Sequence, residues 1–299
     1  MGWPGGATLG LKEWFVEQQT ADMRLELRCT DTLYRGRSRY QDIAIYRTAQ
    51  FGRMLALDDV VMLTESDEFA YHEMLVHPAL LACPRPRRVL VVGGGDGGAV
   101  REVLLHGAVE EVVLAEMDGQ VVAACRDHLP WTAGALDDPR VRVSLGDGAA
   151  FAAAQPDGSF DAVLVDAPDP VGHAEVLFGA DFYRQCRRIL TPAGVLAVQS
   201  DSPFIQPGTT RRVVARLAEG FPTVRVCWAV VPTYAGSLWT FTVASLGADP
   251  AAPAPPERAA ELQGCRYWSP ALHRGAFALP AFAERLVFGC RITAADRAG

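Results

Sequence analysis

The pattern of apolar and polar positions changes along the chain near Pro86. Before it, residues 23–64 consist of short strand-like segments separated by polar or glycine-containing turns, which is typical of β-structure. The segments expected to be strands are Arg24–Arg28, Tyr40–Arg47 and Arg53–Leu57, with turns at Arg35-Gly36 and Phe51-Gly52. We therefore expect residues 1–66 to form a small N-terminal β domain.

After Pro86, continuous apolar runs alternate with segments that are compatible with helices. Runs that are apolar at every position are typical of parallel strands covered on both faces. The expected strands are Arg88–Val92, Val112–Glu116, Val141–Leu145, Ala162–Val165 and Val195–Val198, and the expected helices are Gly98–His106, Gly119–His128 and Asp181–Ile189. This alternation predicts a doubly wound α/β domain with a mostly parallel sheet over residues 67–299.

The end of the chain has a different pattern. Val224–Val231 and Leu238–Ser245 flank the short connector Pro232–Ser237, which predicts an antiparallel hairpin on one side of the sheet. Residues 247–257 contain a proline-rich connector (GADPAAPAPP). Residues 258–290 are expected to form a partly helical closing segment.

Composition narrows the class of function. The chain has 299 residues, of which 49% are hydrophobic and 21% charged, so a disordered protein, a collagen-like repeat and a disulfide-stapled miniprotein are excluded. Its 28 basic and 35 acidic residues give a net charge of −7. Because phosphate contacts need clustered Lys and Arg, we expect no nucleic-acid partner. The acidic balance suits cationic small molecules instead.

Cysteine usage and the lack of long apolar runs predict a cytoplasmic location. The seven cysteines are spread singly, without a Cys-x-x-Cys pair, which is typical of reduced thiols. No apolar run reaches the roughly 18–20 residues of a membrane span. Met1–Gly10 lacks the charged stretch and apolar core of a signal peptide. We therefore expect a reducing compartment and no membrane partner.

The strongest local signal is the segment VLVVGGGDGG, Val89–Gly98, which leads into a helix. A strand that ends in glycines at a helix N-terminus lets backbone N–H groups approach a ligand closely. Glu116 ends the next strand, where a carboxylate can accept hydrogen bonds from both hydroxyls of a ribose. Asp147, in a Gly-Asp-Gly triplet after a third strand, is placed to reach an adenine edge. Together these three strand ends predict a ligand that contains adenosine.

Asp96 is unusual within the glycine segment. Loops that hold a pyrophosphate or a carboxylate use the positive end of the following helix, so a carboxylate inside the loop would repel such a group and attract a cation. The alternative is that Asp96 caps the helix, a common role of Asp. Taken alone, the residue favours the cap. Other aspartates are expected in the same crevice, and together with them Asp96 is more consistent with cation binding.

A second acidic cluster lies in the segment VDAPDPVG. Asp166 ends a strand and Asp169 lies beyond it, in the crevice where open α/β sheets bind ligands. With Asp96 they can converge on ammonium groups. One alternative is an Asp-Pro turn with helix-capping acids. A metal site is discounted, because His72 and His77 are five residues apart and no His and acid pair shows ligand spacing.

In this order along the chain, the motifs closely resemble those of spermidine synthases, the aminopropyltransferases of polyamine biosynthesis. The resemblance covers nearly the whole chain, and its phrases are WF from Trp14, SRYQDI from Ser38, LTESDEFAYHEML from Leu63, VLVVGGGDGG, DDPRV from Asp137, GDG, VDAPDPVG, PTY from Pro232 and FALP from Phe277. The glycine loop is shared with the wider Rossmann-like fold of S-adenosylmethionine-dependent methyltransferases. Asp96 and the YHEM and DxxDP phrases are not shared with that wider fold. The resemblance implies that fold and aminopropyl transfer.

By this resemblance, the protein moves the aminopropyl group of decarboxylated S-adenosylmethionine to putrescine and releases methylthioadenosine. No separate cofactor and no metal are implied, because the donor is a co-substrate. The implied donor-binding residues are Gln41, His72, Asp96, Glu116, Asp147, Gly148 and His173. The implied acceptor-binding residues are Tyr71, Asp166, Asp169 and Tyr234, with Asp166 as the catalytic acid–base residue and Trp14 as a wall of the acceptor site. The family is typically dimeric or tetrameric through its N-terminal β domain.

Two departures from the family pattern bear on the acceptor. His173 stands where a proline commonly follows DPVG, and Ala235 and Gly236 stand in a segment that is PTYPSG-like in the family. Agmatine, cadaverine and spermidine are therefore alternatives to putrescine. A methyltransferase is disfavoured by Asp96. A catalytically silent polyamine-binding protein is disfavoured because the expected catalytic and donor-binding residues are present.

Other aromatic residues and histidines receive no functional assignment. Trp228, Trp239 and Phe241 fall in the expected hairpin and are predicted to pack rather than to bind. The sequence shows no partner for His77, His106, His128 and His273.

Overall fold

The computed structural model describes residues 14–170 and 172–289. Contacts within the chain divide it into two units, Met1–Ser66 and Asp67–Gly299. The six cysteines of the described residues are free thiols, and Cys290 lies outside them. Within the described ranges, no helix is both long enough and apolar enough to cross a membrane.

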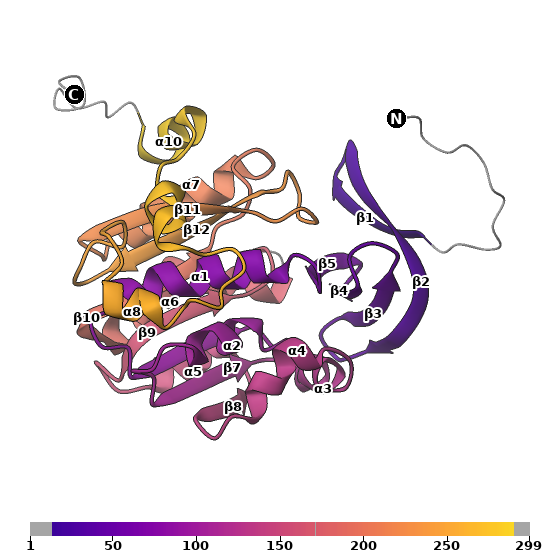
Figure 1. Ribbon diagram of the computed structural model, residues 1–299, viewed down its shortest axis with the longest axis horizontal. Helices are drawn as coiled ribbons and strands as arrows, with labels where there is room; N and C mark the ends of the chain where they lie inside the picture. The colour runs from indigo at the N-terminus through magenta and orange to yellow at the C-terminus, as the bar shows by residue number, and fades with distance from the viewer. Residues whose placement is uncertain (1–13, 171, 290–299) are drawn as a thin grey trace. The chain divides into compact units, whose positions relative to one another are not determined.

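The N-terminal unit is an antiparallel sheet of five strands in the order β1-β2-β3-β4-β5 (Figure 1). The strands are β1 (Trp14–Thr20), β2 (Met23–Arg37), β3 (Asp42–Thr48), β4 (Arg53–Leu57) and β5 (Val60–Thr64). Apolar side chains from these strands form one core, which includes Phe15, Leu27, Tyr46, Met54 and Val61. The expected N-terminal β-structure is confirmed.

The expected turn at Arg35-Gly36 is wrong. Strand β2 continues to Arg37, with register shifts against β3 between Cys29 and Asp31 and again before Tyr34. Gly36 allows a close approach rather than a turn, because a β carbon there would lie 2.5 Å from the Tyr34 hydroxyl oxygen. Strands β1 and β5 were not among the expected elements.

The second unit is built on a seven-stranded sheet in the order β11-β12-β10-β9-β6-β7-β8. Its parallel strands are β6 (Arg88–Gly93), β7 (Glu111–Glu116), β8 (Val141–Leu145), β9 (Phe160–Asp166) and β10 (Leu190–Gln199). The antiparallel hairpin of β11 (Thr223–Val230) and β12 (Leu238–Ser245) joins the sheet beside β10. Both the mostly parallel sheet and the hairpin expected from the sequence are confirmed.

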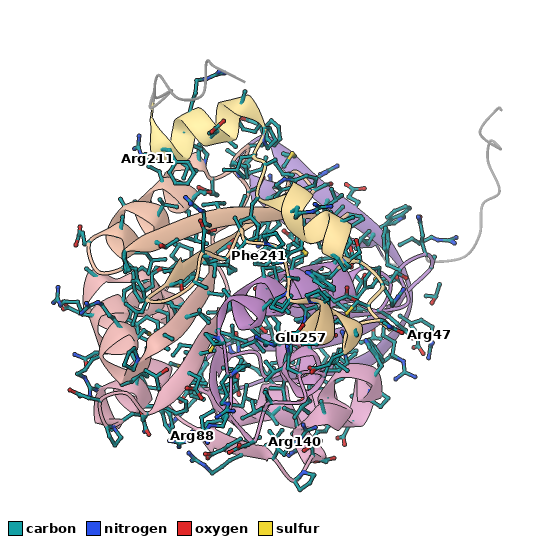
Figure 2. The ribbon with its side chains drawn as sticks, turned by 60° about the vertical axis from the view of Figure 1, so that its left-hand side comes forward. Arg47, Arg88, Arg140, Arg211, Phe241 and Glu257 are labelled. Carbon is teal, nitrogen blue, oxygen red and sulfur yellow. The ribbon has the colours of Figure 1, made fainter. Side chains whose placement is uncertain are left out.

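Helices cover this sheet (Figure 1). Helix α1 (Glu68–Ala82) packs with α2 (Gly98–Leu104), and α6 (Ala180–Ile189) packs with α5 (Gly148–Ala154) and α7 (Pro207–Ala218). The remaining segments before β10 are α3 (Gly119–His128), α4 (Pro130–Ala133) and the 3-10 turns η1 (Gly134–Asp137) and η2 (Gly172–Phe178). Phe241 of β12 is fully buried in the interior, whereas Arg88, Arg140 and Arg211 lie at the periphery (Figure 2).

Helix α1 was not predicted from the sequence. All of its residues except Phe69 are buried, because it packs against α2 and against strands β9 to β12. A helix that is covered all round has no polar face, so the 3.6-residue period that would reveal it is missing. This matters for the site, because α1 carries Tyr71 and His72.

The closing segment is partly helical, as expected, with α8 (Pro256–Ala260), α9 (Pro270–Ala276) and α10 (Ala281–Phe288). Glu73 of α1 binds the backbone of this closing segment. Both carboxylate oxygens of Glu73 accept backbone N–H groups, of Arg266 at 2.8 Å and of Tyr267 and Trp268 at 2.8 and 2.6 Å. These three hydrogen bonds connect α1 to the closing segment.

Candidate active site

The candidate site lies where the strand order reverses. From β6 the chain continues to β7 and β8 on one side, and β9 and β10 lie on the other. Open α/β sheets bind ligands beyond the carboxyl ends of their strands at this switch point. Gly93, at the end of β6, is paired directly with Asp166, at the end of β9. The glycine loop and the second acidic cluster are therefore neighbours in space.

Glycines make room for the side chains of this site. Gly94 has a φ of +69°, and a β carbon there would lie 2.8 Å from Asp166 Oδ2. A β carbon at Gly98 would lie 2.2 Å from Cε1 of His72. The loop is therefore glycine-rich partly because side chains of α1 and β9 pass close to its backbone.

His72 is held by a buried carboxylate on its own helix. Its Nδ1 lies 2.6 Å from Oε2 of Glu68, one turn earlier on α1. Two nitrogens of Arg101 on α2 donate to Glu68 at 2.8 and 2.9 Å. Burial acts to raise the pKa of Glu68, but His72 and Arg101 outweigh it and lower that pKa to about 2. Because Glu68 is ionised, the Nδ1 hydrogen of His72 points toward it.

Two aspartates face the other ring nitrogen of His72. Nε2 lies 3.5 Å from Oδ1 of Asp96 and 3.9 Å from Oδ2 of Asp166. The three ligand atoms lie within 4.8 Å of one another, close enough to enclose one cationic group. Oδ2 of Asp166 is buried and has no hydrogen-bond partner among the described residues. This arrangement favours a positive charge between the two aspartates.

The pKa values of these groups reflect their burial and proximity. Burial raises the pKa of Asp166, with His72 opposing the shift and Asp96 adding to it. Burial acts to lower the pKa of His72, but the carboxylates of Asp96, Glu68 and Asp166 outweigh it and raise that pKa to about 9. At neutral pH, the positive charge that faces the two aspartates is therefore the imidazolium of His72.

The N-cap residue of α2 is Gly97, so Asp96 is not the cap itself, although its side chain contacts the first residue of that helix. Its Oδ1 accepts the N–H of Gly98 at 2.8 Å, at the start of α2, and the same oxygen faces His72. One oxygen of Asp96 thus contacts both the start of α2 and the imidazole of His72.

Tyr71 and Tyr234 form an aromatic wall beside the aspartates. Their ring centroids are 5.6 Å apart in an edge-on arrangement. Phe241 packs on Tyr71 at 5.1 Å, and Trp239 packs on Tyr234 at 4.8 Å. Burial, together with the charge of Asp166, raises the pKa of both tyrosines well above the ordinary value, so they are neutral hydroxyls. Phe241 and Trp239 of the hairpin are packing residues, as expected. The side chains they pack against are those of Tyr71 and Tyr234.

A further acid, Asp201, lies in this region and was not singled out from the sequence. It follows β10, is 2% exposed, and has a φ of +66°. Burial and the charge of Asp169 raise its pKa. Gln199 links the two acids: its Nε2 lies 3.4 Å from Asp169 Oδ1, and its Oε1 accepts the N–H of Asp201 at 3.0 Å. The position after β10, the next strand end beside β9, is the signal that could have identified Asp201.

Glu116 faces the glycine loop from the end of β7. Its Oε2 accepts the N–H of Gly95 at 3.1 Å, and its Oε1 accepts the N–H of Asp118 at 2.8 Å. Burial raises the pKa of Glu116 to about 7. Its carboxyl group is thus positioned against the loop.

Asp147 and Gly148 follow β8 as expected, and both also have structural roles. Asp147 caps α5, because its Oδ1 accepts the N–H groups of Ala149 and Ala150 at 2.8 and 3.3 Å. A β carbon at Gly148 would lie 2.4 Å from Val92 Cγ1, so glycine is required for the close packing of α5 on β6.

The other three expected residues belong to η2 and to the N-terminal unit. His173 is exposed, in η2. Gln41 and Trp14 belong to the N-terminal unit. There, the Gln41 backbone N–H donates to Ser38 Oγ at 3.1 Å, and Trp14 begins β1 with 53% of its surface exposed.

Helix α1 also corrects the expectation that no His and acid pair has ligand spacing. Glu68 and His72, and likewise Glu73 and His77, are four residues apart on it. The ligand atoms of Glu73, His77 and Cys265 lie within 4.8 Å of one another. However, Glu73 already accepts three backbone N–H groups, so this set has a structural explanation.

The sequence suggested no interaction partner for His77, His106 and His273, but each has one in the structure. His77 Nδ1 lies 3.1 Å from His106 Nε2, and His77 Nε2 lies 3.2 Å from Glu102 Oε2 and from Cys265 Sγ. His273 Nε2 lies 3.0 Å from the carbonyl oxygen of Ala252. These contacts join α1, α2 and the closing segment into a buried polar cluster.

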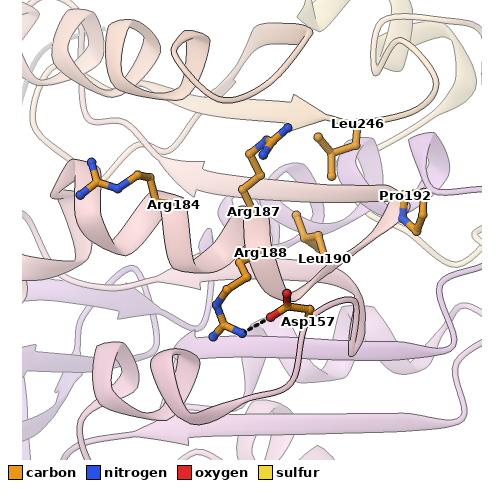
Figure 3. Close-up of a pocket in the computed structure, with 7 residues that line it drawn as sticks. All are labelled: Asp157, Arg184, Arg187, Arg188, Leu190, Pro192 and Leu246. Atoms are coloured by element: carbon orange, nitrogen blue, oxygen red, sulfur yellow. Dashed lines mark hydrogen bonds and ion pairs between the residues drawn. The ribbon is translucent and has the colours of Figure 1, made fainter.

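A hollow of about 520 Å³ lies at the opposite end of the sheet, where Leu190 begins β10 (Figure 3). Its lining residues are Asp157, Arg184, Arg187, Arg188, Leu190, Pro192 and Leu246. Arg188 is paired with Asp157 at 2.6 Å. A lining with three guanidinium groups would repel an ammonium ligand, so this hollow does not share the chemistry of the acidic site.

Comparisons with known families and relatives point to one enzyme family. A family model described as the spermine/spermidine synthase domain matches residues 68–250, and one described as the spermidine synthase tetramerisation domain matches residues 13–65. Proteins named polyamine aminopropyltransferase from Moorella thermoacetica and Bacillus mycoides are each 42% identical over 274 residues. The matches cover 92% of this chain and 96% and 98% of those relatives.

Solved structures show the same fold. A spermidine synthase in complex with the transition state analogue AdoDATO has a TM-score of 0.89 and 35% identity, over 92% of this chain and 95% of that one. Spermidine synthase from Thermotoga maritima has a TM-score of 0.87 and 34% identity, over 92% and 94% of the two chains. These matches confirm the resemblance drawn from the motifs. The chain belongs to the spermidine synthase family and is a polyamine aminopropyltransferase.

Proposed function

We propose that this enzyme transfers the aminopropyl group of decarboxylated S-adenosylmethionine to putrescine, giving spermidine and methylthioadenosine. The observation that carries the proposal is the pair of aspartates, Asp96 and Asp166, that share one positive charge beside the glycine loop. Both substrates bring ammonium groups, and the donor also brings an adenosine. A site of carboxylates next to a nucleotide-type loop fits that combination.

The donor is proposed to lie along the carboxyl ends of β6, β7 and β8. Glu116 would accept from the ribose hydroxyls, and Asp147 with Gly148 would border the adenine. Asp96 would bind the ammonium of the aminopropyl arm, beside His72. Gln41 and His173 are proposed to contact the nucleotide near its thioether end. The support for this placement is the approach of Glu116 to the loop and the family match, one of whose solved members is a complex with AdoDATO.

The acceptor is proposed to lie along Tyr71, Asp166, Asp169 and Tyr234. The neutral tyrosines border an amine without adding charge, and Asp166 would orient the attacking nitrogen. Asp169 and Asp201 form a second acidic group, linked through Gln199, that would bind the far ammonium of a diamine. An acid for each end of the molecule fits putrescine, which carries an amine at each end. Trp14 is proposed as a further wall of this channel.

The chemistry needs orientation and an uncharged amine more than a covalent intermediate. A sulfonium already makes its neighbouring carbon electrophilic, so the enzyme must supply an in-line geometry. An alkylamine titrates near a pKa of about 10.4, so holding it neutral at pH 7 costs about 4.6 kcal/mol. The raised pKa of Asp166 brings it closer to the range in which a carboxylate can exchange a proton with that amine.

Product analysis tests the function directly. The purified protein is incubated with decarboxylated S-adenosylmethionine and, separately, with putrescine, cadaverine, agmatine and spermidine, and ordinary S-adenosylmethionine serves as the control donor. We expect methylthioadenosine and spermidine with putrescine. Faster turnover with another amine would identify that amine, rather than putrescine, as the preferred acceptor. Turnover with the ordinary donor alone would refute aminopropyl transfer in favour of methyl transfer.

Asp201→Asn is expected to raise the KM for putrescine about 10- to 100-fold, because a buried carboxylate that binds an ammonium contributes roughly 1.5–3 kcal/mol. Asn tolerates the positive φ of this position, so the backbone is preserved. Donor affinity should change little. The control is Asp181→Asn, an exposed aspartate on α6 that pairs with Arg184. An unchanged KM for putrescine, measured by initial rates at saturating donor, would exclude Asp201 from acceptor binding.

Assembly is proposed to follow the N-terminal unit. A family model described as a tetramerisation domain matches residues 13–65, and a homodimer or a homotetramer is therefore expected. The mass of the particle in solution, measured by light scattering, distinguishes the two.

A further inference from the structure

The two ring nitrogens of His72 differ in their surroundings. Nδ1 keeps its hydrogen, whereas Nε2 can gain or lose one. Nδ1 lies 2.6 Å from Glu68, which is ionised and held by two nitrogens of Arg101. The hydrogen on Nδ1 therefore stays in place, because this carboxylate can only accept. Any proton that His72 gains or loses is then carried by Nε2, the nitrogen that faces Asp96 and Asp166.

The charged and titratable groups around this ring come from every element packed against it. They are Glu68 and Tyr71 on α1, Arg101 and Glu102 on α2, Asp96 in the glycine loop, Asp166 at the end of β9, and Tyr234 in the β11–β12 connector. Arg101 lies beyond Glu68 and is paired with it and with Glu102. The groups in direct reach of Nε2 are therefore two carboxylates, and both favour the protonated ring. The raised pKa of His72 agrees with this geometry.

An ammonium ligand would compete with that proton. A substrate cation bound beside Asp96 replaces the charge that the imidazolium supplies, and it places a second positive charge next to Nε2. Neutral His72 would then present a lone pair within reach of Asp166, whose Oδ2 is 3.9 Å away and has no hydrogen-bond partner in the described part of the chain.

We propose that His72 is the proton acceptor of the reaction: it releases its Nε2 proton when the donor's ammonium binds at Asp96, and it later receives, through Asp166, the proton that the acceptor amine must lose. The proposal rests on the proposed function, because both steps require the ammonium-bearing substrates. It assigns to the Glu68 and Arg101 pair the role of positioning residues, which keep Nε2 rather than Nδ1 directed at the aspartates.

The proton count of the reaction requires such a group. The acceptor enters as an ammonium and must lose one proton before its lone pair attacks the carbon next to sulfur. As the C–N bond forms, the C–S bond breaks and its electron pair stays on sulfur, so methylthioadenosine leaves neutral and the new secondary amine carries the positive charge. One proton is therefore released in each turnover. Asp166 is in place to pass it on, and His72 Nε2, 3.9 Å from Asp166 Oδ2, is placed to receive it.

The first test counts protons during donor binding. Calorimetric titration at pH 7.5 in two buffers with different heats of ionisation gives the number of protons released. We expect about one proton per decarboxylated S-adenosylmethionine, because His72 is almost fully protonated below its pKa of about 9. Methylthioadenosine, which has the nucleoside but no ammonium, should release close to none. It also shares the ribose contact of Glu116, so the difference between the two ligands excludes that acid as the source.

The second test identifies His72 as the source. His72→Gln keeps a side-chain donor that can reach Glu68 but does not titrate, so donor binding should release no proton. His128→Gln, at the end of α3, is the matched control and should release as many protons as the unaltered enzyme. If His72→Gln does not fold, the imidazole carbon shifts of ¹³C-histidine-labelled enzyme, recorded with and without donor, report the same change of charge.

The pH dependence has a definite sign. Because the imidazolium competes with the donor's ammonium, donor affinity should rise about tenfold per pH unit below about pH 9 and then level off. Above the pKa of Glu116, which is about 7, this slope should be absent for methylthioadenosine and for His72→Gln. Tight donor binding without proton release, or equal release with methylthioadenosine, would overturn the assignment of His72 and leave the proposed reaction intact. Absence of donor binding would refute the proposed reaction itself.

Discussion

Asp166→Asn is expected to lower kcat by about 10²- to 10⁴-fold, the usual contribution of a positioned acid–base group, with donor affinity changed by only a few-fold. Asn has the same shape but cannot accept the proton of the acceptor amine. Asp166 ends β9, pairs in register with Gly93, and points its unpartnered Oδ2 toward His72. Its loss should therefore affect the chemical step more than the binding of the nucleoside.

Single-turnover kinetics with saturating donor and putrescine, together with a separate titration of the donor, measure the two effects independently. Asp181→Asn, an exposed substitution on α6, serves as the control for the loss of one negative charge. If Asp166→Asn retained near-normal turnover, the proton would have to leave through another group and the catalytic assignment would be wrong.

Asp96→Asn is expected to reduce the preference for the decarboxylated donor by up to about a thousandfold. Ordinary S-adenosylmethionine brings its carboxylate toward the glycine loop, where the like charge of Asp96 at about 4 Å and an effective dielectric near 20 costs about 4 kcal/mol. The decarboxylated donor presents only its ammonium, which Asp96 attracts. We therefore expect Asp96 to select the donor by repulsion as well as by attraction.

The variant is suited to this test because its local structure should persist. Oδ1 of Asn can still accept the N–H of Gly98, the bond that Asp96 makes at 2.8 Å. Dissociation constants for both donors are measured for the enzyme, for Asp96→Asn and for Asp127→Asn, an exposed control on α3. We expect weaker binding of the decarboxylated donor and tighter binding of the ordinary one. Equal discrimination in all three proteins would remove Asp96 from donor selection.

The sequence was most informative where local chemistry and fold agree. The segment Val89–Gly98 predicts a strand, a tight loop and a helix, because such glycines are needed wherever a backbone passes close to other groups. The apolar runs at β6, β7 and β9 predict a sheet covered on both faces. The hairpin of β11 and β12 follows from two apolar runs around a short connector.

The sequence was least informative where burial removes the periodic signal. Helix α1 is buried all round, so neither its existence nor the spacing of Glu68 and His72 along one face could be read from a polar and apolar pattern. Strand β2 is a related case, because Gly36 suggests a turn until its close approach to Tyr34 is known. In both cases the deciding contacts are made with side chains that the local sequence does not specify.

For this protein, the sequence alone determined the fold class, the strand ends that carry acids, and the family resemblance with its aminopropyl chemistry. Only the tertiary structure decided which groups meet: His72 lies between Asp96 and Asp166, Glu68 fixes its tautomer, and Asp201 joins Asp169 through Gln199. The physical reason is that motifs record short-range requirements of the backbone, such as a glycine for a tight loop. The charge state of a buried group, in contrast, depends on distances to residues far away in the chain, and only the folded sheet sets those distances.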